Sequence, residues 1–365
     1  MKKNWIAACM TAVCALALVT GCSSETDGPE EIRIEYDADK WLIEGRTVLR
    51  YTGTETDVQV PDGVTVIGKH AFESRTAVAR VTLPDSVAVI EDYAFSGCTG
   101  LADVKLPESV AIIGWYAFRG CESLTGVTIP AKVTAIGQNA FQNCTSLADV
   151  QIPGGVEVIG DSAFRGCGNL TSVTIPASVK TIGSNAFSGC ESLDTVTYQG
   201  TLAQWCALNG SYNLMSSAKH VTIDGEDEEL QSKTELVIPD GVTGIGSGAF
   251  RGCGNLTSVT IPAGVKTIGD SAFRECSGLT EVTIPEGVTE IGQYAFSSCS
   301  KLTTVAIPVS VESIGYDAFY CSSLTGVTYG GTQAQWDKID KSWEIFPSRI
   351  STITGKDGEE INVGD

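Results

Sequence analysis

Cysteine is the most frequent potentially reactive residue type to consider in this 365-residue chain, which contains thirteen cysteines that could form disulfides or bind a metal. Nine recur at one position of a repeating pattern, at residues 98, 121, 144, 167, 190, 253, 276, 299 and 321. A regular stack would place these thiols in one column with parallel side chains, whereas a disulfide needs converging Cβ atoms. The sequence contains no Cys-x-x-Cys pair of the kind that binds zinc. We therefore expect reduced cysteines that pack in the core as small hydrophobes, and no metal site.

Other catalytic residues are scarce. The two histidines, His70 and His220, are far apart in the sequence, and neither belongs to a catalytic motif. The sequence has no Gly-x-Ser-x-Gly elbow, phosphate-binding loop or zinc signature. The acidic run Asp224–Glu229 could hold calcium, but it lacks the alternating pattern of an EF-hand loop. We expect no catalytic residues, no enzymatic activity and no cofactor.

Composition limits the choice of partner. The formal net charge is −20, from 44 acidic and 24 basic residues, so a polyanion would be repelled and nucleic acid is excluded as a partner. Hydrophobic residues make up 42% of the chain, which is enough for a packed core.

The first residues predict export. Lys2 and Lys3 precede an apolar run, Trp5–Thr20, that is short for a membrane span of about 20 residues and typical of a secretory signal. The sequence Leu-Val-Thr-Gly-Cys ending at Cys22 resembles a bacterial lipoprotein signal. That resemblance implies cleavage after residue 21 and lipid on Cys22, with residues 22–35 as a flexible tether. Ordinary secretion with an incidental cysteine is the alternative.

A period of 23 residues organises the rest of the chain. Ala-Phe pairs recur with Phe at 72, 95, 118, 141, 164 and 187, and again at 250, 273, 296 and 319. Proline keeps the same interval, and one unit reads Leu124-Thr-Gly-Val-Thr-Ile-Pro130, then Val133-Thr-Ala-Ile-Gly137, then Ala140-Phe-Gln-Asn-Cys144. Ten pairs in register identify a repeat architecture.

Each unit predicts one coil of a stack. Val127-Thr-Ile129 alternates apolar and polar residues, which indicates a short strand with one buried face, and Pro130 ends it. Ala140 and Phe141 would return to the core across a short helical or 3₁₀ turn. A single coil cannot bury its apolar side, but stacked coils share one core, and their strands form a parallel sheet.

The units are similar to leucine-rich repeats, with Leu-x-x-Val-x-Ile-Pro in place of Leu-x-x-Leu-x-Leu. Their Ile-Gly-x-x-Ala-Phe-x-x-Cys ending resembles the BspA-type class of bacterial surface proteins, over Asp57 to Tyr329. The resemblance implies a right-handed leucine-rich repeat solenoid of 23-residue coils. It also implies a role in attachment to host matrix proteins or other cells.

Two flanking patterns predict caps. Residues 36–57 contain two apolar runs around Glu44-Gly-Arg46 that predict a β-hairpin over the open end of the core. The block Tyr-x-Gly-Thr-x-x-Gln-Trp occurs twice, from Tyr198 and from Tyr329, each time before about twenty irregular residues. We therefore divide the chain into a first array (58–198), a divergent closing block (199–233), a second array (234–329) and a C-terminal closing block (330–365). One continuous solenoid is favoured over two independent domains.

Two surfaces are candidates for ligand binding. On the outward face of the predicted strands, charged and polar residues interrupt a column of threonines at Arg80, Asp103, Lys105, Asp149 and Gln151. Just before the Ala-Phe pairs lie the aromatic residues Tyr93, Trp115 and Tyr116, at positions that are otherwise polar. Exposed aromatic residues can recognise protein or sugar, although scattered apolar surface without a role is the alternative.

These observations favour a lipid-anchored protein of the outer membrane or cell surface, which contacts the membrane only through its N-terminal lipid and binds a host matrix or cell-surface protein. Two alternatives remain, namely glycan capture at the aromatic residues and a structural envelope role without an external ligand.

Overall fold

The computed structural model describes residues 34–224, 226, 229–342 and 344–363. The predicted signal peptide, Cys22 and most of the predicted tether lie outside these residues. Within the described part of the chain, no helix combines the length and apolar character needed to span a bilayer.

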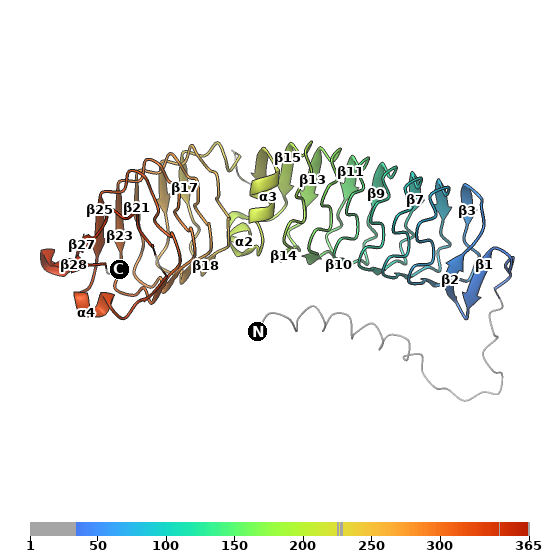
Figure 1. The fold of residues 1–365 in the computed structure, drawn as a ribbon, viewed down its shortest axis with the longest axis horizontal. Helices are drawn as coiled ribbons and strands as arrows, with labels where there is room; N and C mark the ends of the chain where they lie inside the picture. Colours follow the sequence, from blue (N-terminus) through green and yellow to red (C-terminus); the bar gives the residue numbers. More distant parts are fainter. Residues whose placement is uncertain (1–33, 225, 227–228, 343, 364–365) are drawn as a thin grey trace, which may run out of the picture. The chain divides into compact units, whose positions relative to one another are not determined.

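Every coil of the arrays contains a first strand with a valine or leucine on its core side, which is buried in every such strand except β19 (Ser258–Thr260), where Val259 is half-buried. In β9 (Gly126–Thr128), Val127 is buried and Thr128 is exposed, as the alternation predicts. The other first strands are β3 (Asp57–Gln59), β5 (Arg80–Thr82), β7 (Asp103–Lys105), β11 (Asp149–Gln151), β13 (Ser172–Ile175), β15 (Thr195–Tyr198), β17 (Glu235–Val237), β19 (Ser258–Thr260), β21 (Glu281–Thr283), β23 (Thr304–Ile307) and β25 (Gly326–Tyr329). Neighbouring first strands pair in parallel within short sheets, as β9 does with β11, where Val150 lies opposite Val127, whereas β7 and β9 are not paired. The stacked coils are visible in Figure 1.

A second strand in each coil was not anticipated from the sequence. It is two residues long and ends on a buried isoleucine that glycine follows in most coils, as Gly137 follows β10 (Ala135–Ile136). The others are β4 (Val66–Ile67), β6 (Val89–Ile90), β8 (Ile112–Ile113), β12 (Val158–Ile159), β14 (Thr181–Ile182), β18 (Gly244–Ile245), β20 (Thr267–Ile268), β22 (Glu290–Ile291) and β24 (Ser313–Ile314). The arrays thus have a second row of parallel strands beside the row of first strands.

The side of the coil that carries the Ala-Phe pair is built from successive turns. The Ala140 N–H donates to the Gly137 carbonyl at 3.2 Å, and the Cys144 N–H to the Phe141 carbonyl at 3.2 Å. Asn139 and Asn143, with φ of 55° and 59°, lie in the left-handed region and separate these turns, so that no helix propagates. Main-chain bonds also join neighbouring coils here. The Phe141 N–H donates to the Ala163 carbonyl at 2.8 Å, and we call this series of bonds the turn ladder.

From Phe95 onward, each coil of the arrays adds one phenylalanine ring and one thiol to a core that also contains buried valine, isoleucine, leucine and alanine side chains. Adjacent phenylalanines stack face to face, with the centroids of Phe141 and Phe164 5.4 Å apart and their planes 3° apart. The Cys144 thiol donates to the Phe118 carbonyl of the preceding coil at 3.2 Å. All ten cysteines of the described residues are free and buried, which agrees with the predicted reduced ladder.

The predicted hairpin at the N-terminal end is present. Strands β1 (Trp41–Glu44) and β2 (Thr47–Tyr51) are antiparallel, and β2 pairs with β4. The rings of Trp41 and Tyr51 pack against Phe72 at centroid distances of 5.8 and 5.2 Å. Two aromatic side chains therefore cover the first ring of the phenylalanine stack.

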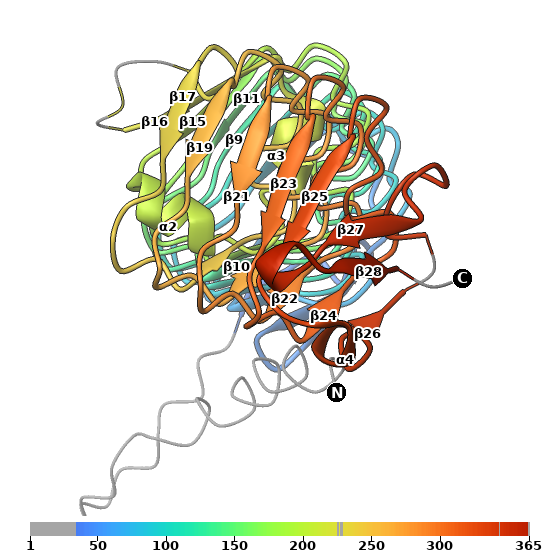
Figure 2. The same cartoon turned by 90° about the vertical axis from the view of Figure 1, so that its left-hand side faces the viewer.

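The closing blocks contain helices where the sequence analysis expected irregular structure. The first holds α2 (Leu202–Ala207), α3 (Tyr212–Ser217) and β16 (His220–Ile223). The second holds α4 (Gln333–Trp336), β26 (Asp340–Lys341), β27 (Thr352–Thr354), the 3₁₀ turn η2 (Lys356–Gly358) and β28 (Glu360–Asn362), seen at the near end in Figure 2. A capping box of Thr201 with Gln204, and of Thr332 with Gln335, starts α2 and α4.

The first closing block bonds to both arrays. On one side, the Asn209 N–H donates to the Lys180 carbonyl at 3.1 Å. On the other side, the Gly246 N–H donates to the Cys206 carbonyl at 2.8 Å. The buried apolar residues of both arrays form one cluster.

Candidate functional site

The first candidate surface is the outward face of the first strands, which we call the strand face. Arg80 on β5 and Asp103 on β7 lie opposite one another in the parallel register, and the Arg80 Nε–Asp103 Oδ2 distance is 3.0 Å. Their side chains are 58% and 61% exposed, so water screens the ion pair and its contribution to stability is small. A partner that offers its own charges could therefore separate the pair at little cost.

The other residues predicted for this surface follow on the same face. Lys105 lies opposite Thr82, Asp149 opposite Gly126, and Gln151 opposite Thr128. All three predicted residues are exposed. The structure thus places Arg80, Asp103 and Lys105 on adjacent coils, while the small residues of β9 lie between them and the Asp149–Gln151 pair.

The second candidate surface is the row of residues just before the Ala-Phe pairs, which we call the aromatic edge. The rings of Tyr93 and Tyr116 stack on one another with a centroid distance of 4.6 Å and an interplanar angle of 9°. His70 extends the stack, with its ring 4.9 Å from that of Tyr93. His70 was not among the predicted surface residues, although it directly precedes its Ala-Phe pair, as Tyr93 and Tyr116 do.

This stacking determines which aromatic ring faces remain open to a ligand. A sugar ring packs on an open aromatic face, but the faces of Tyr93 are covered by His70 and Tyr116. The guanidinium of Arg119 lies 5.7 Å from the centre of the Tyr116 ring. Trp115 remains 36% exposed, and its backbone N–H is held by the Asp92 carboxylate at 2.8 Å. Trp115 is therefore the best exposed of the three predicted aromatic residues.

Backbone geometry explains why these side chains align. His70, Tyr93 and Tyr116 have φ values of 60°, 60° and 58°, which place them in the left-handed region. The same conformation at the same point of consecutive coils projects each side chain in the same direction. The turn ladder sets the interval between them, with the Tyr93 N–H bonded to the Trp115 carbonyl at 2.9 Å.

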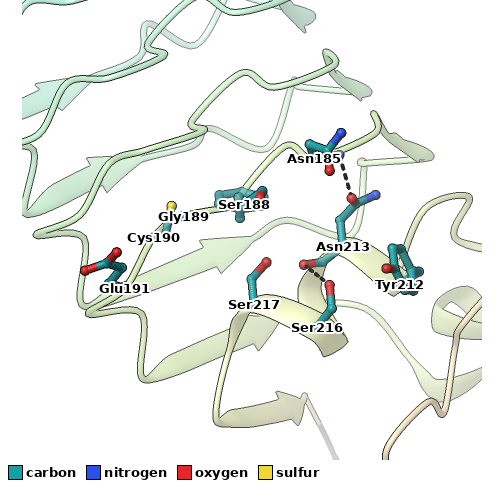
Figure 3. A pocket seen from close by; sticks show the side chains of 10 residues that line it. Asn185, Ser188, Gly189, Cys190, Glu191, Tyr212, Asn213, Ser216 and Ser217 are labelled. Atoms are coloured by element: carbon teal, nitrogen blue, oxygen red, sulfur yellow. Dashed lines mark hydrogen bonds between the residues drawn. The ribbon is translucent and has the colours of Figure 1, made fainter.

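A third feature was missed by the sequence analysis. A cavity of about 320 Å³ lies between the last coil of the first array and helix α3. Its walls are mainly polar, as Figure 3 shows, and include Asn185, Ser188, Glu191, Asn213 and Ser217. The long interval between Phe187 and Phe250, compared with the period of 23, was the sequence signal for an interruption here.

Burial makes the thiols of Cys98 and Cys190 unreactive. Burial raises the pKa of the Cys98 and Cys190 thiols from 9.0 to about 12. Because the thiolate is the nucleophile, these groups are inert at neutral pH. Across the described residues, no group of three or more His, Cys, Asp or Glu side chains has the arrangement needed to hold a metal ion.

Comparison with solved structures returned bacterial leucine-rich repeat proteins. One is a leucine-rich cell surface protein of Faecalibacterium prausnitzii, with 28% identity, coverage of 87% of this chain and 98% of that chain, and a TM-score of 0.49. Another is a leucine-rich repeat protein of Bacteroides ovatus, with 24% identity, coverage of 88% and 99%, and a TM-score of 0.43. A third, the leucine-rich repeat protein of T. pallidum, has 30% identity, coverage of 64% and 91%, and a TM-score of 0.41.

Two further comparisons were made, with curated proteins and with family models, and the family models give the decisive result. No curated protein matches the chain. The model of the BspA type leucine rich repeat region matches in six copies over residues 65–194 and 228–340, which is more than half of the chain. These ranges contain nine of the ten Ala-Phe coils in full, together with most of the turn ladder, the phenylalanine stack and the cysteine column. The chain belongs to the BspA-type leucine-rich repeat family.

Proposed function

We propose that this chain is a lipid-anchored protein of the bacterial cell surface that binds another protein through the strand face of its first array, and that this binding serves adhesion to host matrix or to other cells. The observation that carries the proposal is the set of exposed charged residues on β5 and β7, with Asp149 on the same face of β11. Family membership supports a binding role, and the N-terminal sequence up to Cys22 supports export and anchoring.

The strand face suits a protein partner for physical reasons. Arg80, Asp103 and Lys105 offer charges of both signs at the fixed spacing of adjacent strands, so a partner can match them in register. Rigid strands hold these side chains in place, and little conformational entropy is lost from the backbone on binding. The exposed Arg80–Asp103 pair is easily exchanged for contacts across an interface.

The test is a double charge reversal with a matched control. Asp103→Lys with Asp149→Lys should weaken binding to an immobilised host matrix protein at least tenfold by surface plasmon resonance. Glu235→Lys with Glu281→Lys changes the same strand position in the second array and should leave that binding unchanged. Equal affinities for both variants and the parent chain would eliminate the strand face of the first array.

Exposure on the cell is a separate question. Protease or antibody should reach the chain on intact cells of its source organism, and Cys22→Ser should release the chain from the membrane fraction. Protection from protease on intact cells would instead support a structural role inside the envelope.

Glycan capture is a second candidate because Trp115 stays exposed. Trp115→Ala should then abolish binding on a glycan array, while Tyr93→Ala, which removes a ring already covered on its faces, should have a smaller effect. If both variants bind glycans as well as the parent chain does, glycan capture at this edge is eliminated.

A further inference from the structure

The outer face of the second strands differs between the two arrays. Each of these strands has one residue that points away from the core, next to the isoleucine that is buried. In the first five coils of the first array, these outward residues are apolar and half-buried, namely Val66, Val89, Ile112, Ala135 and Val158. In the second array they are Gly244, Thr267, Glu290 and Ser313. This position of the repeat therefore does not itself require an apolar residue.

The apolar residues of the first array form one surface because their strands belong to one sheet. That sheet contains β1, β2 and every second strand from β4 to β14. Val89 lies opposite Val66 on one side and opposite Ile112 on the other. The residue before each of these strands is uncharged in the first four coils, where the sequence has Thr65, Ala88, Ala111 and Thr134. The surface ends at the fifth coil, where the Glu157 carboxylate pairs with the Lys180 ammonium at 3.0 Å.

The N-terminal hairpin extends this surface with two leucines. Leu42 and Leu49 each follow a buried residue of their strand and therefore point away from the core. The register shifts within the hairpin, since Leu42 lies opposite Arg50 but Ile43 opposite Val48. This bulge explains why two consecutive residues of β2, Leu49 and Arg50, are both exposed. Leu42 is 55% exposed and Leu49 38%. We define the apolar band as Leu42, Leu49, Val66, Ala88, Val89, Ala111, Ile112 and Ala135.

The apolar band begins close to the predicted lipid anchor. Ile34, the first described residue, follows Cys22 by twelve positions, and a chain of that length spans at most about 40 Å. A lipid on Cys22 would thus keep the hairpin near the bilayer surface. Because the tether makes such a contact intramolecular, weak apolar interactions are enough to populate it.

The apolar band and the strand face lie on different sides of the arrays. In the view of Figure 1, the first strands run along the upper side of the molecule and the second strands along the lower side. A bilayer in contact with the apolar band would leave Arg80, Asp103 and Lys105 directed away from the membrane.

We propose that the apolar band rests on the lipid bilayer, with Leu42 and Leu49 inserted among the headgroups, and that this contact turns the strand face outward. The inference rests on the proposed anchoring at Cys22, and it adds a second membrane contact to the lipid expected from the sequence. Burial of apolar side chains drives the contact. Arg50, exposed beside Leu49, can reach lipid phosphate groups. The net charge of −20 disfavours an anionic surface and also disfavours pairing of two copies, so zwitterionic headgroups are the matching surface.

The test holds the chain on vesicles without the need for lipidation. Residues 23–365 with an N-terminal hexahistidine tag, which retain every described residue, are bound to phosphatidylcholine vesicles that contain nickel-chelating lipid. Ala111→Cys carries the thiol-reactive fluorophore acrylodan on the apolar band, and Thr128→Cys carries it on the strand face. The native cysteines in the described part of the chain are buried and should not react. We expect doxyl-labelled phosphatidylcholine to quench the label at residue 111 several times more strongly than the label at residue 128.

Substitutions distinguish the apolar band from the rest of the surface. Leu42→Asp with Leu49→Asp should reduce the quenching at residue 111 to the level at residue 128. Leu42→Ser with Leu49→Ser removes apolar area without adding charge and should reduce the quenching in part. Thr267→Asp with Ser313→Asp adds the same charge at the second strands of the second array and should leave the quenching unchanged.

Three results would overturn the proposal, namely equal quenching of the two labels, no quenching at residue 111, or full quenching in both variants of the hairpin leucines. A spectral shift of the label at residue 111 that follows protein concentration without vesicles would overturn it as well, and would assign the apolar band to a second copy of the chain. Since the tag replaces the lipid, failure of lipidation at Cys22 would remove the proposed anchor and leave this result unchanged. Asp103→Lys with Asp149→Lys should also retain the quenching, so the strand-face proposal fails separately.

Discussion

The indole Nε1 of Trp205 donates a hydrogen bond of 2.8 Å to the carbonyl oxygen of Ala249. In the arrays, that carbonyl position accepts from the phenylalanine N–H of the preceding coil, as the Ala272 carbonyl does from Phe250 at 2.9 Å. Trp205 therefore replaces a main-chain rung of the turn ladder with a side chain. In the second closing block, Trp336 occupies the equivalent position, and its buried Nε1 has no acceptor among the described residues.

This difference predicts unequal effects of the same substitution. Trp205→Phe leaves the Ala249 carbonyl without its donor and should lower the free energy of unfolding by about 1–3 kcal/mol beyond the change in ring size. Trp336→Phe changes ring size alike but breaks no hydrogen bond, so its effect should be smaller. Urea denaturation of both variants measures the difference, and equal losses of stability would contradict the role assigned to the Trp205 indole.

Burial of the cysteines predicts slow modification. In the native chain, the ten cysteines from Cys98 to Cys321 should resist iodoacetamide at pH 8 because all ten are buried away from the reagent. In 6 M guanidinium chloride, all ten should react within minutes. Peptide mapping by mass spectrometry assigns each site. Fast native labelling of Cys144, which lies inside the column, would refute its burial.

The same burial predicts destabilisation at alkaline pH. The thiol pKa of Cys98 is about 12 in the folded chain and 9.0 without burial. Below pH 9, both states are protonated and the full stability is present. Between pH 9 and 12, the unfolded chain loses its proton first, so each such thiol removes about 1.4 kcal/mol of stability per pH unit. Urea unfolding at pH 8, 9, 10 and 11 should show this fall, with a smaller slope for Cys98→Ala. An unchanged slope in Cys98→Ala would contradict the raised pKa of the Cys98 thiol in the folded chain.

Left-handed residues of the turns offer a test of backbone strain. Ser162 has a φ of 54°, a conformation that costs a residue with a Cβ about 1–2 kcal/mol. Ser162→Gly should therefore raise the free energy of unfolding by up to about 1 kcal/mol, after the larger entropy of glycine in the unfolded chain is subtracted. Ser162→Val should lower it, because a β-branched side chain is least compatible with this φ. The opposite order in thermal denaturation would contradict the assigned conformation.

The exposed ion pair of the strand face should matter little for folding. Arg80→Ala breaks the contact with Asp103, but both side chains are more than half exposed, and the expected loss of stability is at most about 0.5 kcal/mol. A shift of several degrees in the melting temperature would show that Arg80 has a structural role.

Much of the fold was determined by the sequence because each coil repeats the same local residues. The Ala-Phe pairs, the prolines and the cysteines recur at 23 residues, and residues with one interval must stack in columns once coils are superposed. The phenylalanine stack, the free cysteines and the first parallel sheet follow from that interval alone. The strand-face residues Arg80, Asp103 and Lys105 could be placed on one face for the same reason, since alternation along a strand decides which side chains face outward.

Features that depend on contacts between unlike segments were decided only by the tertiary structure. The second sheet is made of two-residue strands, which carry too little alternation to be recognised before the coils are aligned. The stack of His70 on Tyr93 depends on the left-handed backbone of both residues, and a positive φ cannot be predicted from a histidine or tyrosine in the sequence. The Trp205–Ala249 bond and the end of the turn ladder at Phe187 arise where the period breaks. There, helix α3 bonds to itself instead of to its neighbour, and no repeating interval remains from which that choice could be deduced.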